Sequence, residues 1–227
     1  MRKDLGAIVM DEYPKINTIW RRDEKTHQII EGDYSCSEFK AIKLWHITEK
    51  IDGTNIRVIY HPHLSPFKVE FRGKTDNAEI SLPLLERLGR LFSAEQLGKQ
   101  FEQSYNVVLY GEGYGGKIQS GKKYCEDCDF ILFDALIDGY WLEPAKTKVL
   151  AHELNVGYVP ELDFLTSVEA EALCKSPPKS AVGNCPIEGI VARSVPLMLF
   201  RKDKTPIMWK LKVRDYTERT KVKGDEK

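Results

Sequence analysis

The chain has 227 residues, of which 42% are hydrophobic and 30% charged, so it can bury a sizeable core and does not have the composition of a disordered chain. Its 34 Lys and Arg residues balance its 34 Asp and Glu residues, which excludes a histone-like or coat-like binder of nucleic acid. Any nucleic acid would therefore have to bind a local cluster of positive charge.

The N-terminal segment lacks the features of a signal peptide, because its short apolar run is interrupted at once by acidic residues and Pro14. No stretch of the sequence approaches the length of a membrane span. We therefore expect a cytoplasmic protein that makes no contact with a membrane. The odd number of cysteines, five, favours reduced thiols over a disulfide framework.

The first half of the chain is predicted to form three strands and a long helix. Strand-like runs cover residues 44–48, 55–61 and 67–72, with polar or proline-containing turns between them, and these runs indicate a meander. Residues 81–103 carry leucines at helical spacing, with Pro83 near the start of the predicted helix.

The second half alternates groups of strands with helices. The predicted elements are strands at 107–110 and 130–137, helices at 145–155 and 167–175, and short strands at 189–193, 197–201 and 207–213. This order predicts an α+β fold and not a regular β-α-β alternation. No Pro-, Gly- or Ser-rich linker divides the chain, so we expect one domain over residues 1–216 and a charged, frayed tail over residues 217–227.

A lysine, Lys50, lies between two predicted strands and is followed by Asp52 and Gly53. A lysine at a strand end is held by the sheet yet can face a pocket. Its amine becomes a nucleophile when desolvation or neighbouring cations release its proton, and Asp52 could orient that amine or a metal-bound water. A surface hairpin with an Asp-Gly turn gives the same four-residue pattern, so the interpretation depends on the motifs that follow.

Two motifs downstream carry charges suited to a nucleotide. Arg72 and Lys74, at positions i and i+2, would face one side of an extended strand and could hold a phosphate or a ribose. Glu112 follows a buried strand among glycines, where a carboxylate can accept the two hydroxyls of a ribose. A solvated strand end and an exposed turn would look the same in the sequence.

Three further motifs lie at the ends of apolar strands. Phe133 could stack on a purine, although a strand phenylalanine usually belongs to the core, and Asp134 follows it. Glu188 precedes another apolar strand, where an acid suits a divalent cation. The lysines of the sequence Met208-Trp209-Lys210-Leu211-Lys212 share one strand face and point either at a triphosphate or into solvent.

Together these motifs resemble those of the covalent nucleotidyltransferase superfamily, which contains DNA ligases, RNA ligases and mRNA capping enzymes. The order is K-x-D-G, a basic strand, G-E-G, F-D, E-G-x-V and K-x-K, from Lys50 to Lys212. The segments 49–55, 111–119 and 13–16 are most similar to the RNA ligase 2-like branch, in particular to its short phage and bacterial stand-alone members.

The resemblance implies a ligase adenylation fold of mainly antiparallel sheets with flanking helices. It implies that Lys50 attacks the α-phosphate of ATP, expels pyrophosphate and holds AMP through a phosphoramidate. It further implies that Glu188 helps to hold a catalytic Mg²⁺ or Mn²⁺, while Lys210 and Lys212 grip the phosphates.

The remaining roles that the resemblance implies concern the nucleoside and its surroundings. Glu49 would contact the amino edge of adenine, Asn55 would assist metal-bound water, Glu112 would bind the ribose, Phe133 would stack on the adenine and Asp134 would brace the site. Either Arg72 or Lys74 would be the basic residue expected on the strand after the nucleophile.

The implied cycle has three steps: adenylylation of the protein, transfer of AMP to an RNA 5′-phosphate, and attack by a 3′-OH. The expected partners are RNA ends, nicked or single-stranded. Larger ligases carry a further domain after the K-x-K strand, whereas only 15 residues follow Lys212 here, so we expect no separate C-terminal domain. A protein partner could then supply RNA-binding surface.

The alternatives are a DNA ligase, a GTP-dependent capping guanylyltransferase, and a non-catalytic module that binds nucleotides or RNA ends. The resemblance at Glu49 and in residues 116–119 disfavours the two other enzymes, and the retention of all the charged motif residues disfavours the module. A zinc site at Cys125 and Cys128 is not expected, because the other cysteines do not have the spacing of a structural zinc site.

Overall fold

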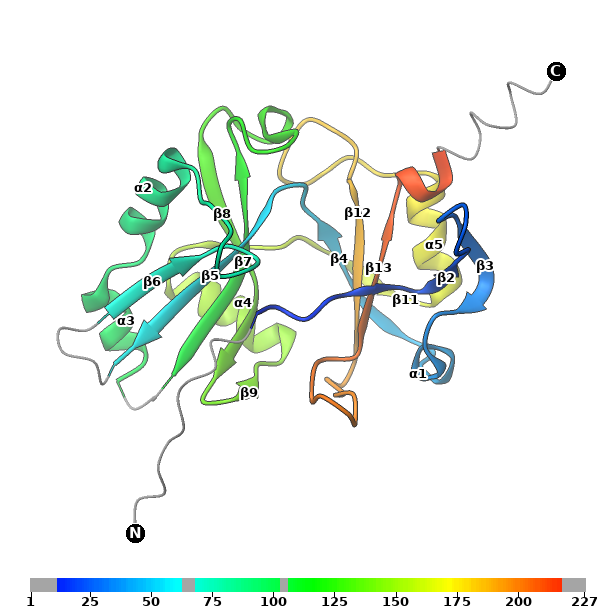
Figure 1. The fold of residues 1–227 in the computed structure, drawn as a ribbon, viewed down its shortest axis with the longest axis horizontal. Helices are drawn as coiled ribbons and strands as arrows, with labels where there is room; N and C mark the ends of the chain where they lie inside the picture. Colours follow the sequence, from blue (N-terminus) through cyan, green and yellow to red (C-terminus); the bar gives the residue numbers. More distant parts are fainter. Residues whose placement is uncertain (1–11, 63–67, 103–105, 218–227) are drawn as a thin grey trace, which may run out of the picture. The chain divides into compact units, whose positions relative to one another are not determined.

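The structure is a computed structural model that describes residues 12–62, 68–102 and 106–217 (Figure 1). The chain divides into two compact units, each assembled from two separate segments of the sequence. One unit contains Gly53–Tyr158 together with Tyr13, and we call it the six-stranded unit. The other contains Pro14–Asp52 and the chain from Val159 onward, and we call it the five-stranded unit. Because the units interleave in the sequence, no linker composition marks their boundary.

The six-stranded unit is built on a sheet with the strand order β10-β8-β7-β5-β6, in which β9 also pairs with β8. All of these pairs are antiparallel except β10 with β8. The strands are β5 (Thr54–His61), β6 (Lys68–Arg72), β7 (Val107–Gly115), β8 (Cys128–Ile137), β9 (Tyr140–Trp141) and β10 (Gly157–Tyr158).

Helices cover one face of this sheet. They are α2 (Leu82–Leu91), α3 (Ala94–Gln100) and α4 (Pro144–Glu153), with a short 3-10 helix, η1, at Gly121–Lys123. Leucines of the helices pack against alternate strand residues such as Ile56, Val58 and Leu109, all of which are buried. Because strand side chains alternate, Asn55 and Glu112 lie on the opposite face.

The five-stranded unit has a sheet with the strand order β1-β13-β12-β4-β11, in which only β1 and β13 are parallel (Figure 1). The strands are β1 (Asn17–Thr18), β4 (Trp45–Lys50), β11 (Glu161–Leu165), β12 (Gly189–Ser194) and β13 (Met208–Lys212). The hairpin of β2 (Trp20–Arg22) and β3 (Ile29–Tyr34) and the helices α1 (Ser37–Ala41) and α5 (Ser167–Lys175) complete the unit.

The core of the five-stranded unit lies on one face of its sheet. Trp45, Ile47, Ile190, Trp209 and Leu211 are fully buried there and belong to one cluster, which also includes residues of α5. Burial of each such side chain contributes about 1.5–3 kcal/mol, which fixes the register of the three central strands. The alternate residues of those strands therefore face the other way.

The predicted α+β fold of mainly antiparallel sheets is confirmed, and α5 has the predicted bounds. Three details of the predicted strands and helices were wrong. The strand β4 does not form a meander with β5 and β6, because it pairs with β11 and β12. The single helix predicted for residues 81–103 is two helices, because Ser93 caps α3 by accepting a hydrogen bond from the Gln96 amide. Residues 197–201 form only an isolated bridge, Leu199 with Pro206.

The domain bounds 1–216 and 217–227 stay a prediction, and of the tail only Thr217 lies among the described residues. None of the helices in the described ranges has the length and apolar character needed to cross a bilayer.

Candidate functional site

Lys50, Gly189 and Lys212 form a row across three neighbouring strands of the five-stranded unit. Gly189 of β12 pairs with Lys50 of β4 on one side and with Lys212 of β13 on the other. Residues that are directly opposite in a sheet share a face. The two lysine side chains therefore leave the same face of the sheet, with no side chain between them. We call Lys50, Gly189 and Lys212, together with Glu188, the lysine row.

Glu188 bridges the two lysines with its carboxylate. Lys50 Nζ donates to Glu188 Oε2 at 2.6 Å, and Lys212 Nζ donates to Glu188 Oε1 at 2.6 Å. The side chains are only 21%, 18% and 20% exposed for Lys50, Glu188 and Lys212. The nucleophile predicted from the sequence therefore lies in a charged, largely buried cluster and does not point into bulk water.

The lysines determine the ionisation of Glu188. Burial acts to raise its pKa, but the charge of Lys50 and the hydrogen bonds from Lys212 and Lys50 together act more strongly. The pKa of Glu188 is therefore lower than the usual value for a glutamate, and the carboxylate is ionised near neutral pH. An anionic oxygen ligand in this position is the type that a hard divalent cation prefers.

Gly189 is required at the centre of the row. A Cβ atom at this position would lie 2.2 Å from the carbonyl oxygen of Leu211 and 2.9 Å from the Cα of Lys212. Both atoms belong to the backbone of β13, so that strand would have to move away.

We predict that Gly189→Ala lowers the free energy of unfolding by about 1–3 kcal/mol, because the added methyl overpacks a strand pair. Urea unfolding measures the change. Gly89→Ala is the control, because a Cβ at Gly89 in α2 meets nothing within 4 Å and alanine favours a helix. A midpoint for Gly189→Ala equal to that of the wild type would contradict the close contact.

Lys210 lies two residues before Lys212 and therefore on the same face of β13. It pairs with Val191 of β12 and with Thr18 of β1. Trp209 and Leu211 are fully buried on the opposite face, which confirms that the two lysines share a side. Asp52 lies just beyond the end of β4, in the turn that follows Lys50.

Glu49 precedes the lysine in β4, and its carboxylate is 1% exposed. Its Oε2 accepts a hydrogen bond from the Ala181 amide at 3.1 Å. Its Oε1 is buried and has no hydrogen-bond partner among the described residues. A buried acceptor without a donor costs about 1–3 kcal/mol, and the amino group of a ligand could supply that donor.

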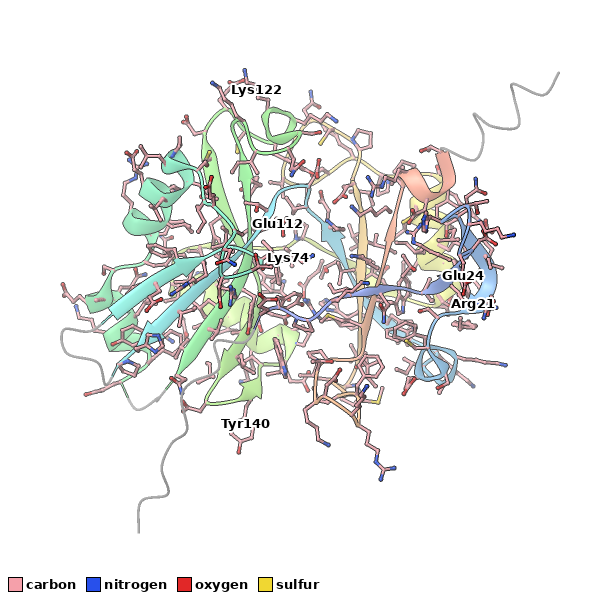
Figure 2. All side chains as sticks on the ribbon, in the orientation of Figure 1. Arg21, Glu24, Lys74, Glu112, Lys122 and Tyr140 are labelled. Carbon is pink, nitrogen blue, oxygen red and sulfur yellow. The ribbon has the colours of Figure 1, made fainter. Side chains whose placement is uncertain are left out.

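Three predicted residues of the six-stranded unit, Asn55, Arg72 and Glu112, lie on the face of its sheet that the helices do not cover. Asn55 of β5 pairs with Glu112 of β7, which Figure 2 labels. Two residues farther along β5, on the same face, Arg57 pairs with Arg72 of β6 and with Tyr110 of β7. The Asn55 Oδ1 atom is buried and unpartnered within the described ranges. We call this the polar face.

Arg72 and Lys74 do not form a pair on one strand, contrary to the sequence prediction. The strand β6 ends at Arg72, whose guanidinium donates to Glu70 Oε2 at 2.8 Å. Lys74 is exposed in the turn that follows β6 (Figure 2). The alternation of side chains along a strand therefore does not determine which way its side chain points. The structure therefore leaves both residues as candidates.

Phe133 and Asp134 lie at an irregularity of β8. Tyr110 pairs with Asp134 and Gly111 pairs with Leu132, so Phe133 is the extra residue of a bulge. The Phe133 ring lies 5.0 Å from the ring of Tyr13, edge-on. Asp134 is buried and accepts a hydrogen bond from the Tyr13 hydroxyl.

The sequence analysis missed Arg57, a fully buried arginine of β5. Its Nε donates to the carbonyl oxygen of Gly73 at 2.9 Å, and its Nη2 donates to Asp76 at 2.8 Å. It therefore holds the turn that carries Lys74. The available signal was an arginine inside the apolar run Ile56–Tyr60. The contact of Tyr13 with Asp134 was not predictable from the sequence, because the two residues are 121 positions apart.

Within the described residues, no three His, Cys, Asp or Glu side chains gather as a group that could hold a metal ion by themselves. All five cysteines are free.

The sequence model of the RNA ligase family matches residues 43–212, a range that contains every motif from Lys50 to Lys212. The chain belongs to the RNA ligase family. No curated protein matches it in sequence. The family match covers parts of both units, so the RNA ligase motifs extend over the six-stranded and the five-stranded unit alike.

Solved structures of Naegleria gruberi RNA ligase share the fold. The complex with PPi is 21% identical, with a TM-score of 0.62, over 98% of this chain and 63% of that one. A point mutant with ATP and Mn is 23% identical, with a TM-score of 0.61, over 81% of this chain and 54% of that one. A mutant with AMP and Mn has a TM-score of 0.61 and 21% identity over 92% of this chain and 64% of that one. This RNA ligase family chain thus spans little more than half the length of the ATP-bound relative.

Proposed function

We propose that the chain is an ATP-dependent RNA ligase that carries AMP on Lys50, transfers it to an RNA 5′-phosphate and seals that end to a 3′-OH. The observation that supports this best is the lysine row, in which one lysine at a strand end shares a largely buried carboxylate with a second lysine. Membership of the RNA ligase family supports it as well. So do the ATP, AMP, PPi and Mn found with a relative of the same fold.

In the first step the Lys50 amine attacks the α-phosphorus of ATP. A bond forms between nitrogen and phosphorus, and the bond from that phosphorus to the departing pyrophosphate breaks. The ammonium must first release its proton and leave its ion pair, because a protonated amine has no lone pair. The Glu188 carboxylate, which accepts a hydrogen bond from Lys50 Nζ at 2.6 Å, is placed to receive this proton. Lys210 and Lys212 then offset the charge that develops on pyrophosphate.

The residues fit a Mg²⁺ or Mn²⁺ ion that is held jointly by Glu188 and by substrate phosphates. Magnesium commonly binds one or two carboxylates together with phosphate oxygens and water, and Glu188 supplies one ionised carboxylate. The ion would neutralise charge on the phosphates during transfer. Glu188 would then exchange at least one of its lysine contacts for the ion.

The contacts to the nucleoside are assigned to side chains outside the lysine row. The unpartnered Oε1 of Glu49 suits the adenine amino group, and Glu112 on the polar face suits the ribose hydroxyls. Asn55 offers a buried, unpartnered oxygen for a metal-bound water. We assign adenine stacking to Phe133. Asp134 braces the site through its contact with Tyr13. Asp52 orients Lys50 or a metal-bound water. Either Arg72 or Lys74 supplies the basic contact to the nucleotide.

Incubation with ATP, GTP or NAD, each radiolabelled in the transferable nucleotide, tests the proposal in the presence of Mg²⁺ or Mn²⁺. We expect a protein-bound label from ATP alone, which acid releases as AMP because a phosphoramidate is acid-labile. Label from GTP alone would contradict the proposal and indicate a guanylyltransferase. Absence of label from all three would indicate a binding module. Sealing of RNA, compared with DNA, then tests the later steps and the need for a protein partner.

A further inference from the structure

The five-stranded unit contains a groove of about 900 Å³ beside its lysine row. Its walls are the first strand β1 with the residues before it, the β2–β3 hairpin, and the end of β13 with the residues that follow. The motif lysines Lys210 and Lys212 line it, so it begins at the row itself. Because Lys212 also donates to Glu188, and Glu188 accepts from Lys50, the groove is connected to the nucleophile by direct contacts.

The lining of the groove is strongly basic. Six of its residues are lysine or arginine, and one is a carboxylate, Asp215; the basic residues are Lys15, Arg21, Arg22, Lys210, Lys212 and Arg214. The whole chain has a formal net charge of zero. Three of these residues form ion pairs, Arg21 with Asp33, Arg22 with Asp215 and Lys212 with Glu188. The remaining excess of basic side chains gives the groove a local positive field, which attracts polyanions in spite of the neutral chain.

The single carboxylate of the groove is already neutralised. Asp215 accepts from Arg22 Nη2 at 2.9 Å and from the backbone amide of Lys212 at 3.3 Å. It thus fixes the hairpin to the end of β13. Lys15 and Arg214 are exposed, and both lie in the lining. Their charges are available to a ligand that occupies the groove.

The basic residues of the groove come from two separate segments of the chain. The strand β1 runs parallel to β13, with Thr18 opposite Lys210, so basic residues from both chain segments follow the groove. From Lys15 to Arg22 the chain passes through β1, bends at Ile19 and continues as β2, so basic side chains lie at several points along it. Successive phosphates of one strand in a duplex are only about 3.4 Å apart along the axis, so several basic side chains can contact one strand.

We propose that this basic groove binds the phosphate backbone of a single RNA strand and leads its end to Lys50. The inference rests on the proposed ligase function and adds the surface that recognises the RNA. A positively charged groove is how proteins follow a single strand without reading its sequence. The side chains of Asn17, Thr18 and Gln28 also line the groove and offer hydrogen bonds to phosphates and 2′-hydroxyls.

The test variant reverses two exposed charges of the groove lining, Lys15→Glu with Arg214→Glu. The matched control, Lys40→Glu with Lys43→Glu, makes the same change in net charge at exposed lysines of the same unit that do not line the groove. Fluorescence anisotropy measures binding of a 5′-phosphorylated single-stranded RNA of about ten nucleotides over a series of salt concentrations.

We expect the groove variant to lose at least about tenfold in RNA affinity near 0.1 M salt, with a salt slope that is flatter by about 1.4 for two lost phosphate contacts. The control variant should stay close to the wild type, and both variants should form the AMP adduct at the wild-type rate and ATP dependence. Equal losses in both variants, or unchanged RNA affinity in the groove variant, would overturn the inference.

The adduct assay separates this inference from the proposed function. A groove variant that needs more ATP for adduct formation would show that the groove holds ATP phosphates, and the RNA assignment would be wrong. If the wild type forms no adduct with ATP, the ligase proposal fails by itself, whatever the RNA affinities are. If the wild type forms the adduct and only the groove variant loses RNA, both proposals gain support.

Discussion

Lys50→Ala is expected to reduce formation of the protein–AMP adduct by at least about a thousandfold, because the reaction loses the atom that bonds to phosphorus. The fold should remain. The Lys50 side chain is 21% exposed, and its hydrogen-bond partners are the Glu188 carboxylate and the Ile51 carbonyl, so its removal opens no apolar cavity. Radiolabel transferred from ATP measures the adduct, and circular dichroism with thermal unfolding measures the fold.

Lys50→Arg is the matched control for charge. It keeps a cation beside Glu188, but a guanidinium stays protonated and cannot attack. We therefore expect Lys50→Arg to remain folded and as inactive as Lys50→Ala. If either variant still carries AMP, another residue is the nucleophile, and the assignment of Lys50 is wrong.

The strand faces were predictable because alternation is a local property. The lysines of β13 were assigned to one face from the sequence Met208-Trp209-Lys210-Leu211-Lys212, and the burial of Trp209 and Leu211 confirms this. The bounds of α5 were predictable for the same reason. In the structure Thr166 and Glu169 form a capping box at its start, a local contact that spans only four residues.

Strand pairing was not predictable because it depends on distant segments. Neighbouring strands in the sequence usually pair, which favoured a meander of β4 with β5. The core instead places β12 beside β4, although Lys50 and its partner Glu188 are 138 residues apart. The lysine row exists only through this pairing. The motifs indicated which residues carry the chemistry, whereas their mutual contacts required the structure.

Glu188→Gln should lower the rate of adduct formation roughly a hundredfold, which is the scale of losing one well-placed electrostatic contact. Glutamine keeps the shape and can still accept a hydrogen bond, but it removes the negative charge that two ammonium groups share at 2.6 Å. It also removes the anionic ligand for Mg²⁺ or Mn²⁺. Single-turnover labelling with ATP at several Mn²⁺ concentrations measures the loss. A wild-type rate and metal dependence in this variant would exclude Glu188 from the site.

The stabilisation that the Glu188 charge gives the folded protein should depend on pH, and its ion pairs with the two lysines determine the direction. The pKa of Glu188 is lowered in the folded protein, whereas a glutamate in the unfolded chain has a pKa of about 4.3. The stabilisation by its charge is therefore fully present above that pH and is lost as the pH falls through the lower folded value. We expect the difference in unfolding free energy between wild type and Glu188→Gln to be constant near neutral pH and to shrink below about pH 4. A difference that grows in acid would mean that the lysines do not hold this carboxylate ionised.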